Sequence, residues 1–212
     1  MKSKITFLLT LFWMMGINRS IGQSHHSLII NEIMADPSPV VQLPLYEWVE
    51  IKNNSKELIQ LLGWKLVAGN SVSSPFPSYF LSPDSLLIVC SSSAAILLKN
   101  YGSTIGLSSF PALNNEGETL SLRAPNGKTI HAVTYSQTWY GVSWKQEGGW
   151  SLELIDKNAA CWATDNWTAS VDSKGGSPGK PNSQTGKIIN SAALAPLHAY
   201  APDNKTVVVY FN

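Results

Sequence analysis

The 212-residue sequence has little charge, few cysteines and almost no helical periodicity. Asp, Glu, Lys and Arg make up 14% of the chain, and 15 basic residues against 14 acidic ones leave a formal charge of +1. The basic residues are scattered rather than clustered, which argues against the electrostatic surface of a nucleic-acid-binding protein. With 8 Trp and so few charges, the surface is expected to depend on hydroxyls, amides and aromatic rings.

Long apolar runs are absent except at the start of the chain. The first 22 residues begin with MKSK, continue with ITFLLTLFWMMGI and end in NRSIG. This order predicts a secretory signal peptide over residues 1–22, cleaved near Gly22. The run is shorter than the roughly 20 residues of a spanning helix, and no later run is longer, so we expect no transmembrane segment in the mature chain. The protein is therefore expected to be secreted or held at the cell surface.

The only two cysteines, Cys90 and Cys161, both lie in the exported part. In an oxidising compartment an even pair more often forms a disulfide than stays as two thiols. A bridge between them would close a loop of roughly 70 residues and add about 4 kcal/mol of stability in the chain-entropy model. The alternative is that Cys90, which ends the run LLIVC, is a buried thiol packed like a small hydrophobic residue.

Short strands between turn residues predict an all-β domain. Only SSAAILLKNYG, residues 92–102, has the Ser start and Gly end of a short helix. The continuous apolar run LLIVC predicts a strand buried on both faces. In LNNEGETLSLRAPNGKTIHAVTYS, residues 113–136, Asn126-Gly127 predicts a tight hairpin because both residues tolerate positive φ.

The strand in YEWVEIKNNS is expected to be half-buried. Val49 and Ile51 lie on one face, and Trp48, Glu50 and Lys52 lie on the other. The next segment, ELIQLLGWKL, is expected to pair with this strand. A glycine within it indicates a bulge or a close approach of backbone.

The composition shifts to Gly, Pro, Ser and Lys in NWTASVDSKGGSPGKPNSQTG, which indicates the edge of the domain and then a linker over residues 184–195. In residues 196–212, Val207, Val209 and Phe211 alternate and predict the first strands of a further β unit. So short a segment cannot bury its own core, so we expect that the chain stops early or that its natural product continues past Asn212.

Taken together, these segments resemble the lamin tail domain, the immunoglobulin-like module found at the tail of nuclear lamins and in many secreted bacterial proteins. The resemblance covers about residues 27–183. It is carried by INEIMADPSP, YEWVEIKNNS, IQLLGWKL, LSPDSLLIVC, LNNEGETLSLRAPNGKTIHAVTYS, GGWSLELID and NWTASVDSKGGSPGKPNS. The signal peptide, the two cysteines and GGWSLE are similar to the bacterial secreted type. The chain differs from lamins in lacking a heptad rod and a prenylation box.

This resemblance implies an immunoglobulin-like β-sandwich, with two sheets packed over an apolar core. It also implies a binding or structural module with no conserved catalytic constellation, often joined to extracellular enzymes or other immunoglobulin-like repeats. Because a fold alone does not establish a function, the ligand has to be inferred from particular residues.

Four acidic residues could supply paired carboxylates or calcium ligands: Glu32, Asp36, Glu47 and Glu50. No Asp-x-Asp-x-Asp-Gly loop accompanies them. We expect Glu47 and Glu50 to lie at a solvated strand edge, and Asp36 to stabilise the turn before Pro37.

The histidines and serines likewise indicate no active site. His25-His26 follows the cleavage point and is a poor metal cage, and His131 has no acidic or nucleophilic neighbour in the sequence. There is no Gly-x-Ser-x-Gly elbow, and SKGGSPGK lacks the strand-to-helix setting of a phosphate loop. We therefore expect no enzymatic activity, no metal and no cofactor.

Aromatic residues are the most suggestive feature, because TWYGVSWKQEGGW places four of them close together. Flat rings of this kind can stack on sugars or on a partner protein. Trp150 is expected in the core. Trp139, Tyr140 and Trp144 are candidate ligand contacts if exposed, and ordinary core residues if not.

The sequence thus predicts a non-enzymatic, secreted or cell-surface module for binding, adhesion or structural scaffolding within a larger extracellular protein. Its expected partners are an extracellular glycan or protein surface and downstream domains of the same chain. One alternative is an accessory, substrate-targeting domain of an extracellular hydrolase. A weaker alternative is a DNA-binding module, which the scattered charge disfavours.

Overall fold

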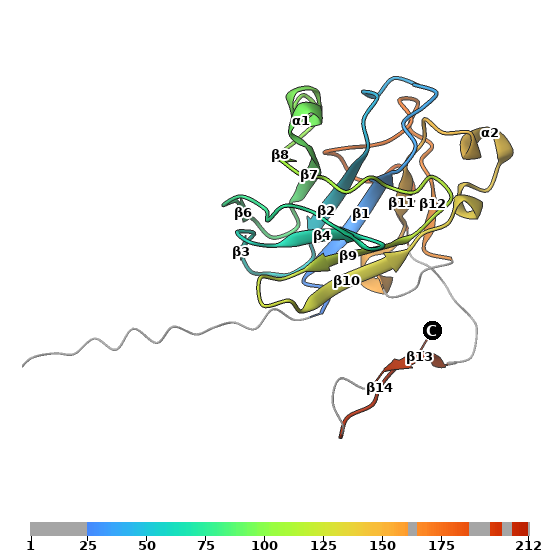
Figure 1. Ribbon diagram of the computed structural model, residues 1–212. Coiled ribbons are helices and arrows are strands. Elements are labelled where there is room, and N and C mark those ends of the chain that lie inside the picture. The colour runs from blue at the N-terminus through green and yellow to red at the C-terminus, as the bar shows by residue number, and fades with distance from the viewer. Residues whose placement is uncertain (1–24, 161–164, 187–195, 201–204, 212) are drawn as a thin grey trace, which may run out of the picture.

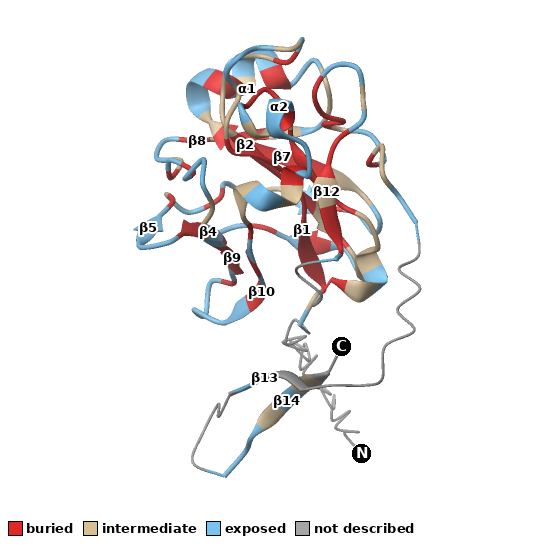
Figure 2. Cartoon of the chain, turned by 90° about the vertical axis from the view of Figure 1, so that its right-hand side faces the viewer, coloured by how far each residue is buried: buried red, intermediate tan, exposed pale blue. Residues whose placement is uncertain are grey.

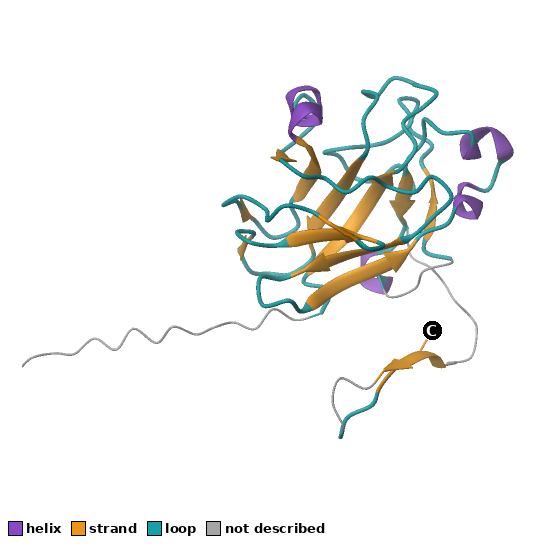
Figure 3. Cartoon of the chain, in the orientation of Figure 1, coloured by secondary structure: helices purple, strands orange, loops and turns teal. Residues whose placement is uncertain are grey.

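A computed structural model describes residues 25–160, 165–186, 196–200 and 205–211. Two sheets pack face to face, with short helices and loops around them (Figures 1 and 3). The larger sheet has the strand order β12-β11-β1-β2-β7-β8. Its strands are β12 (Trp167–Ala169), β11 (Leu152–Leu154), β1 (Leu28–Met34), β2 (Trp48–Asn53), β7 (Leu86–Ser91) and β8 (Thr104–Leu107). All neighbours in it are antiparallel except β7 and β8.

The smaller sheet has the order β10-β9-β4-β5. Its strands are β10 (Thr129–Thr134), β9 (Thr119–Arg123), β4 (Lys65–Ala68) and β5 (Ser71–Val72). β9 and β10 form the predicted hairpin, and Gly127 in their turn has φ +84°. This arrangement of two packed sheets confirms the predicted all-β sandwich.

The main core lies between the two sheets, and the buried residues of both sheets are red in Figure 2. Burying a Val, Leu or Ile side chain stabilises the folded state by about 1.5–3 kcal/mol. From the larger sheet the core includes Ile30, Ile33, Val49, Ile51, Leu87, Val89, Leu152 and Leu154, and from the smaller sheet Leu66, Leu120, Leu122, Ile130 and Val133.

The opposite face of the larger sheet is also buried. Helix α1 (Ser92–Leu98), which connects β7 to the parallel strand β8, covers one part of it. The hydroxyl of Ser91 accepts a hydrogen bond from the Ala94 backbone N–H (3.2 Å) and caps this helix. A second cluster forms here from Met34, Leu43, Trp48, Ile88, Cys90, Ala94 and Leu98. The short helix and the doubly buried strand at LLIVC are both confirmed.

Two sequence predictions about β2 are wrong. The strand is not half-buried, because Trp48 and Glu50 on its outer face are as fully buried as Val49 and Ile51. Nor does residue range 57–66 pair with it, because β1 and β7 occupy both of its edges. Instead β3 (Ile59–Gln60) pairs with β6 (Phe80–Leu81), and β4 joins the smaller sheet.

Three short helical turns lie near the ends of the sandwich. They are η1 (Gln137–Tyr140), α2 (Ser143–Gln146) and η2 (Lys157–Ala159). Within the described ranges, no helix has the length and apolar character needed to cross a membrane.

Beyond the sandwich, β13 (Pro196–Tyr200) and β14 (Val208–Phe211) form a separate antiparallel pair. That this pair begins a further β unit stays a prediction. The predicted signal peptide (1–22), Cys161 and most of the predicted linker fall outside the described residues.

Candidate functional site

Three glutamates form a row on the outer face of the larger sheet. Glu153 of β11 lies opposite Glu32 of β1, which in turn lies opposite Glu50 of β2. All three are fully buried. Directly opposed residues in an antiparallel sheet have Cβ atoms about 5 Å apart, so three potential negative charges lie side by side in the protein.

A loop covers this row, and we call residues 175–184 the strap. One backbone N–H of the strap donates to each carboxylate: Ser177 to Glu32 Oε1 (2.7 Å), Gly179 to Glu50 Oε2 (2.6 Å) and Gln184 to Glu153 Oε2 (2.9 Å). The Gly, Pro and Ser content that indicated a domain edge therefore gives a segment that closes one face of the sheet.

Polar side chains complete the network around the glutamates. The hydroxyls of Ser151 and Ser183 donate to Glu32 Oε1 (2.6 Å) and Glu153 Oε2 (2.7 Å). Asn31 Nδ2 donates to Glu50 Oε1 (2.9 Å). Each carboxylate thus accepts at least two hydrogen bonds, as buried ionisable groups require. The donors to Glu153 all belong to the strap, whereas Glu32 and Glu50 also accept from Ser151 and Asn31.

The position of Ser177 indicates where a proton is held. Its Oγ lies 2.8 Å from Glu153 Oε1 and 3.3 Å from Glu32 Oε2. A hydroxyl has one hydrogen and can donate to only one of them. If Ser177 donates to the nearer Glu153, the second contact is a hydrogen bond only when a protonated Glu32 donates to Ser177 Oγ. The geometry therefore favours a protonated Glu32.

The electrostatics agree with this assignment. Burial raises the pKa of Glu32 well above its usual value, and the charges of Glu50 and Glu153 raise it further. Burial also raises the pKa of Glu50 to about 7, against the lowering effect of its hydrogen bonds from Gly179 and Asn31. The row is consequently not fully ionised at neutral pH.

This row corrects the expectation that Glu50 lies at a solvated edge. Sequence reasoning also missed Glu153, although one signal was present: a glutamate interrupts three apolar strands, in NEIM, WVEI and SLEL. The prediction for Asp36 is confirmed, since its Oδ1 accepts from the Ser38 N–H (3.1 Å) in the turn. Glu47 is half-buried, and its Oε2 accepts from the Leu113 N–H (3.1 Å).

His131 is a core residue. Its Nδ1 accepts from the Ile30 N–H (3.2 Å), so its Nε2, 3.3 Å from the Ala160 carbonyl oxygen, is the nitrogen that carries the hydrogen. Burial lowers the pKa of His131 to about 4. Both ring nitrogens are engaged, and the imidazole is neutral at physiological pH.

Cys90 is buried and packs in the second cluster, and its Sγ lies 3.7 Å from the Ile105 carbonyl oxygen. Burial raises its pKa to about 12. This packing matches the alternative stated for Cys90. The Cys90–Cys161 bridge itself stays a prediction, because Cys161 is outside the described part of the chain.

The aromatic segment forms a feature that we call the aromatic corner, consisting of the exposed Trp144, the buried Lys145 and the half-buried Trp150. Trp144 is 55% exposed and meets Trp150 edge to face, with ring centroids 5.2 Å apart and an interplanar angle of 83°. The Lys145 ammonium lies 5.3 Å from the Trp144 ring and 4.5 Å from the Trp150 ring. It also donates to the Ser170 carbonyl oxygen, so the corner is fixed to the sandwich beside β12.

The structure separates the three aromatic candidates. Trp144 is exposed as a ligand contact requires. Tyr140 is not, because only 5% of it is exposed and it belongs to the main core. Trp139 is half-buried and stacks on Trp167, with centroids 6.3 Å apart. Trp150, predicted to lie in the core, only packs against it from the corner.

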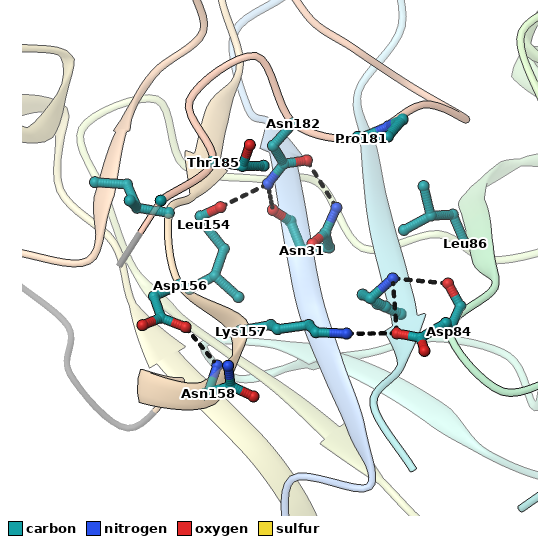
Figure 4. A pocket seen from close by; sticks show the side chains of 13 residues that line it. Asn31, Asp84, Leu86, Leu154, Asp156, Lys157, Asn158, Pro181, Asn182 and Thr185 are labelled. Atoms are coloured by element: carbon teal, nitrogen blue, oxygen red, sulfur yellow. Dashed lines mark hydrogen bonds and ion pairs between the residues drawn. The ribbon is translucent and has the colours of Figure 1, made fainter. Parts of the chain in front are cut away.

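A pocket of about 410 Å³ opens on the outer face of the larger sheet, beside the end of the strap (Figure 4). It is lined by strands, by η2, by the end of the strap and by the two residues that follow it. No residue of the aromatic corner contributes to it. Elsewhere in the described ranges, no three His, Cys, Asp or Glu side chains gather in a way that could hold a metal ion.

Comparison with known families gives one match. The family model described as Lamin Tail Domain matches residues 22–137, which is more than half of the chain and includes every strand from β1 to β10. The strap, β11 and β12 follow the matched region. No curated protein matches the chain.

Proposed function

The chain belongs to the lamin tail domain family, a family of non-catalytic immunoglobulin-like β-domains, and from this premise we propose that it is a non-enzymatic, secreted or cell-surface module that binds an extracellular partner. The aromatic corner is the feature that most strongly supports binding. The secreted location rests on the signal peptide predicted over residues 1–22.

The state of the acidic groups supports the non-enzymatic part of the proposal. A general acid or base must come within hydrogen-bond reach of a substrate proton. Glu32, Glu50 and Glu153 are fully buried, and the strap amides and neighbouring hydroxyls contact their oxygens. Their pattern of partners is that of a structural network.

The aromatic corner has the properties of a rigid contact surface. The Trp144 ring is held from behind by Trp150 and Lys145, so binding need not order a mobile side chain. An exposed indole offers a flat face that stacks on the apolar face of a sugar ring, and Trp gives a large contact area at a small entropic cost. We propose a glycan as the ligand, with a protein surface as the alternative.

Replacing Trp144 should remove binding without affecting the fold. We expect Trp144→Ala to reduce retention of the exported protein on insoluble polysaccharide, tested with cellulose, chitin and peptidoglycan, by at least tenfold. The melting temperature should change little because the ring is largely exposed. Phe80→Ala is the matched control, since Phe80 is 59% exposed on β6 and lies outside the corner.

Trp139→Ala should have the opposite effect to Trp144→Ala, a loss of stability rather than a loss of retention. Its ring stacks on Trp167 and packs against the main core, so its loss should lower stability by about 3 kcal/mol.

If wild-type protein is not retained on any of the polymers, or if Trp144→Ala is retained as well as wild type, the glycan proposal is wrong.

A further inference from the structure

The pocket is lined by five separate parts of the chain. They are β1, the end of β2, the start of β7 with the turn before it, the end of β11 with η2, and residues 181–186. Its volume of about 410 Å³ falls within the range of small-molecule sites. The lining residues are Asn31, Lys52, Asp84, Leu86, Leu154, Ile155, Asp156, Lys157, Asn158, Pro181, Asn182, Thr185 and Gly186.

The floor of the pocket is rigid. The pairing of β1 with β2 shifts register between Ile30 and Glu32, and Asn31 lies at this bulge. Asn31 Nδ2 donates to Glu50 Oε1 and to Asn182 Oδ1 (2.9 and 2.8 Å). Asn182 Nδ2 donates to the Asn31 and Leu154 carbonyl oxygens (2.9 and 2.8 Å). With these donors engaged, a ligand must find its hydrogen bonds elsewhere in the pocket.

Two lysines at the rim supply such donors. Lys157 Nζ lies 2.5 Å from Asp84 Oδ1, and Lys52 Nζ lies 3.5 Å from the same oxygen and donates to the Asp84 carbonyl oxygen (2.7 Å). Figure 4 shows Lys157 reaching along the pocket from η2 to Asp84. One carboxylate therefore lies between two ammonium groups, and the hydrogen bond from Lys157 lowers its pKa.

This carboxylate can be replaced at little cost. The Asp84 side chain is 70% exposed, and exposed ion pairs contribute little to stability. The other acidic residue of the lining, Asp156, lies at the opposite end of the pocket in Figure 4, where its Oδ1 accepts from the Asn158 N–H (2.9 Å) and caps η2.

We propose that this pocket binds a carboxylate on an apolar body, held between the ammonium groups of Lys52 and Lys157 in the place that the Asp84 side chain now occupies. Leu86 and Pro181 provide apolar surface for the rest of the ligand. Both the C-terminal residue of a peptide and a free apolar acid have this chemistry. The site goes beyond the glycan contact of the aromatic corner and is independent of it.

The carboxylate is tested by comparing N-acetyl-leucine with N-acetyl-leucinamide in NMR titrations of the exported protein. We expect the acid to shift the backbone amide signals of Leu86, Ile155 and Gly186, and the amide to bind at least tenfold more weakly. A peptide that ends in leucine identifies the source: tighter binding than N-acetyl-leucine points to a chain end, and equal binding points to a free acid. Equal affinity for acid and amide, or no shift with either, would overturn the proposal.

Substitutions at the rim test the two lysines. Asp84→Asn should tighten binding of the acid at least threefold because it removes the competing carboxylate. Asn tolerates the φ of +58° at this position, so the fold should be kept. Lys157→Gln should weaken binding at least fivefold, and Lys56→Gln, an exposed lysine outside the pocket, should not change it.

Two results of these substitutions would contradict the site. They are weaker binding to Asp84→Asn and unchanged binding to Lys157→Gln. Trp144→Ala should leave affinity for the acid unchanged, so that failure of the glycan proposal and failure of the carboxylate site are distinguishable.

Discussion

Gly179→Ala should strongly destabilise the strap. A Cβ at Gly179 would lie 2.2 Å from the Tyr101 carbonyl oxygen and 2.8 Å from Gly102 Cα, both backbone atoms that cannot rotate away. The residue also has φ +74°, which L side chains rarely adopt. We expect a loss of more than about 3 kcal/mol, because the strap must leave its position and uncover buried carboxylates.

Gly141→Ala is the matched control for this change. Gly141 also has φ +74°, but a Cβ there would have no atom within 4 Å. It should lose only the backbone strain, about 1 kcal/mol. The difference between the free energies of urea unfolding of the two variants measures the contribution of strap packing. Equal free energies would show that the strap does not pack against the turn after α1.

Stability should fall as pH rises from 6.5 to 8.5. The folded pKa values of Glu32 and Glu50 are raised above the unfolded value of 4.5. The folded state therefore binds more protons, and the stability from these groups is complete below pH 4.5 and is lost as pH rises through the folded pKa values. Glu50, with a pKa of about 7, should account for about 1 kcal/mol over this window, and Glu32 should add to it.

Most of the opposing effect of His131 lies below this window. Its folded pKa of about 4 lies below the unfolded value of 6.5, so its contribution is lost as pH falls through 6.5 toward 4. At pH 6.5 about half of the unfolded chains still carry a protonated His131, and above about pH 7.5 the residue is neutral in both states. Because His131 is the same in wild type and in a glutamate variant, the difference between their pH slopes reports the glutamate row.

Glu32→Gln tests the assigned proton directly. A Gln side chain matches a protonated Glu32, with Oε1 accepting from Ser151 and Ser177 and an N–H donating to Ser177 Oγ. We expect this variant to be more stable than wild type at pH 8.5 and to have a shallower pH slope. Glu116→Gln makes the same substitution at an exposed residue and should keep the wild-type slope.

Unfolding curves of wild type and Glu32→Gln at several pH values test whether Glu32 is protonated in the folded protein. An unchanged slope in Glu32→Gln would place the raised pKa elsewhere. A large loss of stability at pH 6.5 would mean that Glu32 is ionised in the folded protein.

Features set by local sequence were predictable. Asn126-Gly127 determines the β9–β10 turn through its own backbone preference, and LLIVC is apolar at every position because both faces of β7 are covered. The run from Ser92 forms α1 because it has a capping serine before it. The signal for the turn, for the strand and for the helix is contained in a few neighbouring residues.

Features that depend on distant contacts were not predictable from pattern alone. Glu50 looked like a solvated residue because alternation in β2 gives no information about what covers the outer face. The strap covers that face from more than 120 residues further along the chain. Pairing of residues 57–66 with β2 was inferred from adjacency in sequence, but both edges of β2 were already occupied by β1 and β7.

The aromatic ligand-contact candidates differ in burial, and the local sequence does not show which of them is exposed. Tyr140 and Trp144 are only four residues apart, yet Tyr140 ends η1 inside the core while Trp144 lies on α2 and faces solvent. The pocket was missed entirely, because it brings Asn31, Asp84, Lys157 and Asn182 together only in the folded chain.

Binding through the aromatic corner is tested most directly by following the indole N–H signals of the exported protein during titration with soluble oligosaccharides of the polymer that retains it. The signals of Trp144 and Trp150 should shift and saturate, while those of the fully buried Trp48 and Trp64 should stay in place. Saturating shifts confined to other tryptophans, or no shift at Trp144, would contradict the account.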